Sequence, residues 1–119
     1  MARLCALTAM LAALMWLILA GFESVALDAA RYDRLHAQLN VYDSAGLDRE
    51  SLSLVMRDLV DYIRGDTDNL NVNAQVDGMV QPVFNEREIE HMKDVRALFD
   101  LERVMRNAAA AASAALLVA

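Results

Sequence analysis

Residues 4–22 read LCALTAMLAALMWLILAGF, and this stretch decides the fold because it contains no charged residue and no proline. Its length is close to the roughly 20 apolar residues that cross about 30 Å of hydrocarbon as a helix. Trp16 and Phe22 lie toward its C-terminal half, and aromatic side chains favour the membrane interface. We therefore expect residues 1–27 to form an N-terminal transmembrane helix.

A cleaved signal peptide is the rival interpretation, with Arg3 as the charged region before the apolar run. The run is longer than the usual signal-peptide core, and the small-residue pattern around Ala26 is a poor cleavage site. A retained anchor is therefore favoured. Arg3 also favours a cytoplasmic N-terminus, which would place the following residues outside the cell membrane. This orientation would also place Arg103 and Arg106 on the outer side, whereas the positive-inside rule favours arginine on the cytoplasmic side.

The middle of the chain, residues 28–107, is polar and strongly charged, and we expect it to form a small extracytoplasmic head domain. The whole chain has 119 residues and a formal net charge of −6. That acidity argues against nucleic acid as a partner, because phosphates call for a basic surface. The single cysteine, Cys5, cannot form an intramolecular disulfide.

Helical periodicity marks the first part of the head. Residues 28–40 are expected to continue helically out of the membrane, and residues 43–46 to form a turn. Asp48 looks like the N-cap of a helix over residues 49–64, which Gly65 would end. The apolar stripe of that helix is Leu52, Val55, Met56, Leu59, Tyr62 and Ile63.

The period changes over residues 70–84. Apolar and polar residues alternate from Leu70 to Asp77, as in a half-buried strand. Asp77-Gly78 then predicts a tight hairpin turn, because glycine accepts positive φ. Pro82 would confine the returning strand to an edge. We expect this hairpin to lie on the helices or on the membrane surface.

Asn85 and Glu88 have the spacing of a capping box, and the helix that they would begin has no stop signal. It is expected to run on into the apolar residues 108–119. Twelve helical residues span only about 18 Å, which is too short for a bilayer. The expected fold is thus a mostly α membrane protein with a transmembrane helix, a small α+β extracytoplasmic head (helix, β-hairpin, helix) and the start of a truncated second transmembrane helix.

Glu88, His91 and Asp94 recur at intervals of three and therefore share a face of this helix. A carboxylate one turn from an imidazole can orient it as a general base. Glu-x-x-His is also a metal-ligand spacing, although the chain has no second such motif and no cysteine pair. A solvated face with incidental charge pairs is the third interpretation. We expect no metal and no cofactor. The other histidine, His36, is interpreted as structural.

The run FNEREIEHMKDVRALF, residues 84–99, resembles the signature of the Lit-type lipoprotein intramolecular transacylases, a family of small bacterial membrane proteins. Three further features match: Tyr32 shortly after the first apolar helix, with Asn40-Val41 and Gly46 following; a Leu-x-x-Tyr-Ile-Arg-Gly stretch over residues 59–65; and an extended segment before the histidine motif. The resemblance covers most of residues 26–106, and the histidine motif is its most specific part.

The resemblance implies a four-helix membrane protein that moves an acyl chain from the glyceryl group of a lipidated N-terminal cysteine to the amine of that cysteine. A membrane lipid or lipoprotein would be the substrate. His91 would be the base, Glu88 or Asp94 would orient it, and Tyr32 would donate a hydrogen bond at the site. A second family histidine, on a later loop, has no counterpart here. A non-enzymatic, membrane-anchored scaffold or partner-binding module is the alternative, and the oligomeric state is left open.

Overall fold

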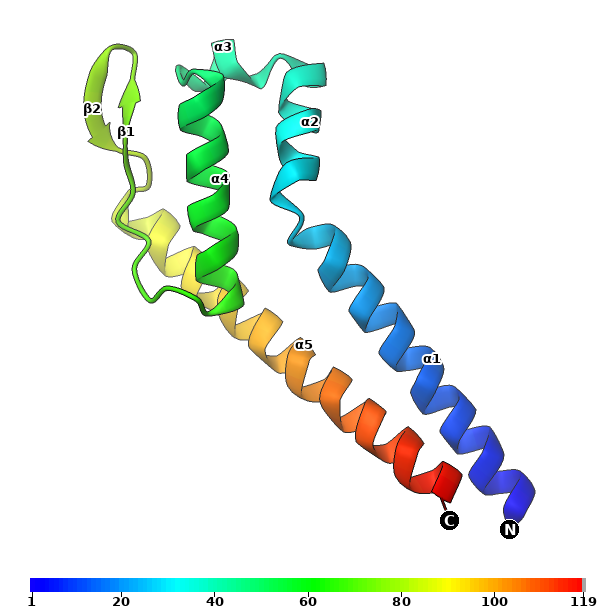
Figure 1. The fold of residues 1–119 in the computed structure, drawn as a ribbon. Coiled ribbons are helices and arrows are strands. Elements are labelled where there is room, and N and C mark those ends of the chain that lie inside the picture. The colour runs from blue at the N-terminus through cyan, green and yellow to red at the C-terminus, as the bar shows by residue number, and fades with distance from the viewer. Residues whose placement is uncertain (119) are drawn as a thin grey trace. The chain divides into compact units, whose positions relative to one another are not determined.

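The computed structural model describes residues 1–118, which are mostly helical with one two-stranded sheet (Figure 1). The elements in chain order are α1 (Ala2–Ala26), α2 (Ala29–Leu39), α3 (Val41–Ala45), α4 (Arg49–Arg64), β1 (Asn73–Val76), β2 (Met79–Pro82) and α5 (Glu86–Val118). They form two compact units. The head unit comprises residues 27–97, and the helix-pair unit comprises residues 1–26 together with residues from 98 onward.

Helix α4 begins and ends as the sequence predicted. The Asp48 side chain accepts a hydrogen bond of 2.7 Å from the Ser51 amide, which satisfies one of the free N–H groups of the first turn. This bond lowers the pKa of the Asp48 carboxyl below its ordinary value, because Ser51 stabilises the charged form. Gly65 ends the helix with a φ of 87°.

The core of the head unit lies between α2 and α4, which run side by side in Figure 1. Its buried apolar residues are Leu27, Leu47, Leu52, Val55, Val60, Tyr62, Ile63 and Leu70. Four of these belong to the predicted stripe of α4, whereas Val60 was not predicted. Met56 and Leu59, which were predicted, are only half-buried. The burial of one face explains why this strongly amphipathic helix is stable, since tertiary packing supplies most helix stability.

The hairpin has the predicted turn but shorter strands. Val76 pairs with Met79 and Asn73 with Pro82 in an antiparallel ladder. The two turn residues, Asp77 and Gly78, have φ of 50° and 86°, the two positive values of a type I′ turn. Residues of β1 alternate between exposed and half-buried, as predicted. The Asp77 amide donates to the carbonyl oxygen of Gly46 at 3.0 Å, which ties the hairpin to the end of α3.

Two local predictions were wrong. Residues 28–40 do not continue the first helix, because Asp28 takes an extended conformation and caps α2 through a 3.2 Å bond from the Arg31 amide. An N-cap residue begins a new helix rather than extending an old one. The segment expected as a turn over residues 43–46 is the end of the short helix α3, which Gly46 terminates with a φ of 66°.

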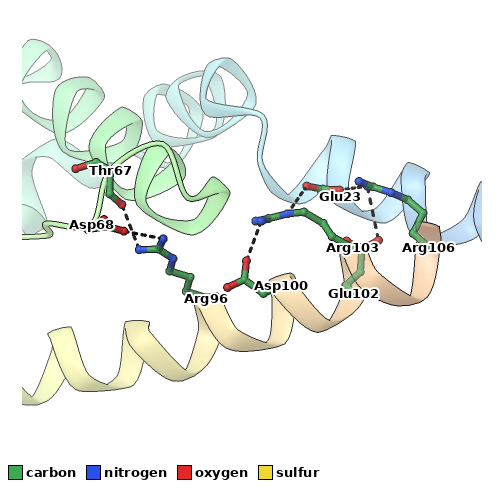
Figure 2. A network of polar contacts seen from close by, with 8 residues as sticks. All are labelled: Glu23, Thr67, Asp68, Arg96, Asp100, Glu102, Arg103 and Arg106. Carbon is green, nitrogen blue, oxygen red and sulfur yellow. Dashed lines mark hydrogen bonds and ion pairs between the residues drawn. The ribbon is translucent and has the colours of Figure 1, made fainter. Parts of the chain in front are cut away.

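Helix α5 runs without interruption through residues 108–118, as predicted, while residue 119 lies outside the described residues. In the head unit, Arg96 of α5 donates to the carbonyl oxygen of Thr67 (3.2 Å) and to the Asp68 carboxylate (3.0 Å) (Figure 2). Its guanidinium also lies 4.9 Å from the centroid of the Tyr62 ring. The hydrogen bond to Asp68 raises the pKa of Arg96. Arg96 thereby connects α5 to the loop that follows α4.

The helix-pair unit consists of α1 and the C-terminal part of α5, which pack antiparallel. Small residues form the contact: Ala9 is 2% exposed, Ala109 is buried, and the Ser113 hydroxyl donates to the carbonyl oxygen of Ala9 at 3.2 Å. Small side chains let two helices approach closely, as in membrane helix pairs. Phe22 and Phe99 stack with ring centroids 5.8 Å apart.

A charged cluster joins the two helices of this unit (Figure 2). Glu23 of α1 accepts from Arg103 at 3.3 Å and also pairs with Arg106. Asp100 accepts from Arg103 at 2.8 Å. Glu102 is only 9% exposed, and its carboxylate pairs with Arg106 at 3.8 Å.

Within residues 1–118, α1 is the one helix whose length and composition would suit a membrane crossing. Most of its large apolar side chains are exposed, among them Leu7, Leu11, Leu14, Leu17 and Ile18. A continuous apolar surface of this size is unusual on a monomeric soluble protein.

Candidate functional site

The first turn of α5 is held by a complete capping box. The Asn85 amide donates to the Glu88 carboxylate at 2.8 Å, and the Glu88 amide donates back to the Asn85 side-chain oxygen at 2.9 Å. Both bonds were predicted from the spacing of these two residues. They fix the start of α5 and therefore the direction in which the next turn, with His91, presents its side chains.

His91 lines a pocket of about 350 Å³ on the head unit. The lining residues are Phe84, Arg87, Glu88, His91 and Met92. Phe84 and Met92 give the pocket apolar walls, and the polar groups come from Arg87, Glu88 and His91, which lie within about one turn of α5. A largely apolar pocket with a few convergent polar groups is the usual form of a small-molecule site. A neighbouring hollow of about 630 Å³ shares Phe84 and Glu88 with this pocket.

The structure brings together two of the four predicted site residues, His91 and Glu88, as neighbours in this pocket. Among the described residues, neither Glu88 nor Asp94 forms a hydrogen bond with His91. One Glu88 oxygen is taken up by the Asn85 amide, so the capping role and the orienting role use the same carboxylate. Asp94 is exposed and lies outside the lining of the pocket.

Tyr32, the fourth predicted site residue, lies on α2. Its ring centroid is 6.4 Å from that of His36 in the same helix. It is not among the described residues that line the His91 pocket. His36 has a buried Nδ1 atom without a hydrogen-bond partner among the described residues, which agrees with a packing role better than with a solvent-facing one.

The charges on the rest of this helix segment pair with one another. Glu90 pairs with Lys93 one turn later, and this hydrogen bond raises the pKa of Lys93. The pair lies outside the lining of the His91 pocket. Within residues 1–118, no three His, Cys, Asp or Glu side chains are grouped so that they could hold a metal ion.

Arg87 is a pocket residue that the sequence analysis did not single out. It lies four residues before His91, on the same helix face, and is exposed. The same spacing rule that grouped Glu88, His91 and Asp94 would have grouped Arg87 with His91. The pocket shows that the apolar walls meet His91 on the side of Arg87 and Glu88 and not on the side of Asp94.

The chain thus combines a mostly helical head, in which a histidine lines a largely apolar pocket, with an apolar N-terminal helix. Residues 7–119 match the family model described as "Lipoprotein intramolecular transacylase Lit". This chain therefore belongs to the Lit lipoprotein intramolecular transacylase family. No curated protein and no solved structure matches the chain.

Proposed function

We propose that this chain takes part in acyl transfer on lipidated proteins at the outer face of the cell membrane. The acyl chain moves from the glyceryl group of an N-terminal cysteine to the amine of that cysteine. Membership of the Lit family supports the reaction class. The single observation that supports a site is the pocket that His91 lines together with the apolar side chains of Phe84 and Met92.

The reaction needs a base and a group that stabilises negative charge. The amine nitrogen forms a bond to the ester carbonyl carbon, and the bond from that carbon to the glyceryl oxygen then breaks. One amine proton passes to His91 and from there to the departing glyceryl oxygen, which becomes a hydroxyl. The products are an amide and an alcohol, so no oxidant or cofactor is required. Glu88 is the orienting carboxylate in this scheme, and the family resemblance would make Tyr32 a hydrogen-bond donor to the substrate.

The exposed apolar surface of α1 supports a membrane location. We place α1 across the bilayer as a retained anchor, with a cytoplasmic N-terminus and the head unit outside. Residues 108–118 enter the bilayer beside it, and the small-residue contact of Ala9 with Ser113 fits that setting. A lipid-linked substrate would then reach the head unit by diffusion in the membrane.

His91→Gln tests the reaction in the full chain, expressed in membranes with a diacylated lipoprotein substrate. We expect loss of acyl transfer by about 100- to 10,000-fold, because that is the usual contribution of a general base. Mass spectrometry of the N-terminal lipopeptide would show whether the acyl group is on the glyceryl oxygen or on the amine. His36→Gln is the matched control and should leave acyl transfer unchanged.

A non-enzymatic membrane-anchored module is the second candidate. The observation that favours it is the engagement of Glu88 by Asn85, which leaves His91 without a hydrogen-bonded carboxylate. On that hypothesis, His91→Gln would leave the acyl position of every lipoprotein unchanged while the chain remained folded in the membrane. Such a result would reject His91 as the base.

A further inference from the structure

Arg87 is the one guanidinium that lines the His91 pocket among the described residues. It forms no hydrogen bond and no ion pair within residues 1–118, in contrast to Arg96, Arg103 and Arg106, which are all paired. The pocket thus contains a histidine, apolar walls and a cation whose N–H groups are available to a ligand.

Glu88, which also lines this pocket, has one carboxylate oxygen engaged at the start of its own helix. Its carboxylate accepts from the Asn85 amide at the N-terminus of α5. Free N–H groups and the dipole at a helix N-terminus stabilise a negative charge there. Glu88 therefore offsets the helix end, and Arg87 remains as positive charge facing the pocket.

Acyl transfer creates negative charge on the ester carbonyl oxygen when the amine nitrogen adds to the carbon. Family resemblance would give the donor for that oxygen to Tyr32, which does not line the pocket. Arg87 lies one helical turn from His91, so a carbonyl group held near the histidine is within reach of a long, flexible guanidinium.

We propose that Arg87 is a catalytic residue of the reaction proposed above, donating hydrogen bonds to the carbonyl oxygen as it becomes an oxyanion. The acyl chain that carries this carbonyl lies against Phe84 and Met92. This assignment rests on the proposed function, and it names both the charged group and the apolar walls that recognise an acyl ester.

The test separates charge from apolar contact by using two probes with the same alkyl chain. One is an alkyl phosphonate monoester, which mimics the tetrahedral anion, and the other is the corresponding neutral ester. Binding of each to the full chain in detergent micelles is measured by calorimetry. Arg87→Gln should weaken phosphonate binding by about 10- to 100-fold, the effect expected from a charge-assisted hydrogen bond, and leave ester binding unchanged. Arg87→Lys should restore part of the loss.

Three controls make the outcome decisive. Phe84→Ala should weaken both probes equally, because it removes apolar contact only. Arg57→Gln, an exposed arginine on α4, should affect neither probe. Tyr32→Phe tests the rival donor. Equal phosphonate binding by wild type and Arg87→Gln, or a selective loss in Tyr32→Phe instead, would overturn the assignment.

Activity distinguishes this proposal from the proposed function. If His91→Gln abolishes acyl transfer and Arg87→Gln leaves its rate unchanged, the reaction stands and the role of Arg87 is rejected. If wild type transfers no acyl group and binds neither probe, both fail together. A loss of rate in Arg87→Gln with an unchanged KM, combined with the selective loss of phosphonate binding, supports the oxyanion role.

Discussion

Gly46 has a backbone conformation that an L side chain opposes. Its φ is 66°, and a Cβ atom there would lie 2.5 Å from an oxygen of the Asp77 carboxylate. Gly46→Ala should therefore lower the free energy of unfolding by about 1–2 kcal/mol, the usual penalty of left-handed backbone for a residue with a Cβ. Chemical unfolding of the full chain in detergent, followed by circular dichroism, measures this change.

Gly21→Ala is the opposite control. Gly21 lies within α1, and an added Cβ would meet no atom within 4 Å. Alanine should stabilise this position by up to about 1 kcal/mol, because glycine loses more backbone entropy in a helix. Equal effects of the two substitutions would show that the conformation of Gly46 does not matter to stability.

Helix caps and tight turns were predictable from the sequence, because they depend on residues that are close together in the chain. Asp48, Asn85 and Gly78 are examples. The candidate site was less predictable. The spacing of the sequence placed Glu88 near His91. It could not decide whether the Glu88 carboxylate caps α5 or orients His91, and it did not show which face of α5 meets Phe84.

At the scale of elements, the cap of α4 gives a pH-dependent prediction. Ser51 lowers the pKa of Asp48 below 3.8 in the folded chain, so the folded state holds this charge more strongly than the unfolded state does. The resulting stability is fully present above the unfolded pKa and is lost as the pH falls through the lower, folded pKa. Asp48→Asn keeps a good cap but has no carboxyl to titrate.

Thermal unfolding is measured from about pH 7 to about pH 3. The unfolding temperature of wild type should exceed that of Asp48→Asn at neutral pH, and this difference should shrink at the acid end. Asp58→Asn, on an exposed position in the middle of α4, serves as the comparison. If wild type and both variants follow parallel curves down to the lowest pH, the cap contributes no pH-dependent stability.

Element boundaries were harder to predict than element types. The sequence pattern of residues 1–40 predicted one continuous helix. In the structure, Asp28 instead caps a separate helix, α2. The sequence contains the capping aspartate, but the alternative of a longer helix satisfies the same periodicity. The strand pattern from Leu70 was also longer than β1, because regular pairing ends at Asn73 opposite Pro82.

For the whole molecule, the retained anchor predicts that α1 is present in the mature chain and resists extraction from membranes at alkaline pH. Leu11→Arg with Leu14→Arg places two charges on exposed positions of α1. Each should oppose insertion by roughly 2.5–3.5 kcal/mol at the centre of a bilayer, so the doubly substituted chain should be extracted.

Leu54→Arg, on an equally exposed leucine of α4, should leave the chain in the membrane fraction. Intact mass spectrometry of the purified protein decides between anchor and signal peptide. A mature chain that begins after Ala26 would reject the anchor.

The ion pair between Glu23 and Arg103 also constrains the order in which parts of the chain can assemble during synthesis. The two residues are 80 positions apart. At a synthesis rate of about 5–20 residues per second, roughly 4–16 s pass between the appearance of the glutamate and of its arginine. During that interval the whole of residues 27–97 is made, and Glu23 must be solvated by water or by lipid head groups. The helix pair can therefore assemble only after all of the head has been synthesised.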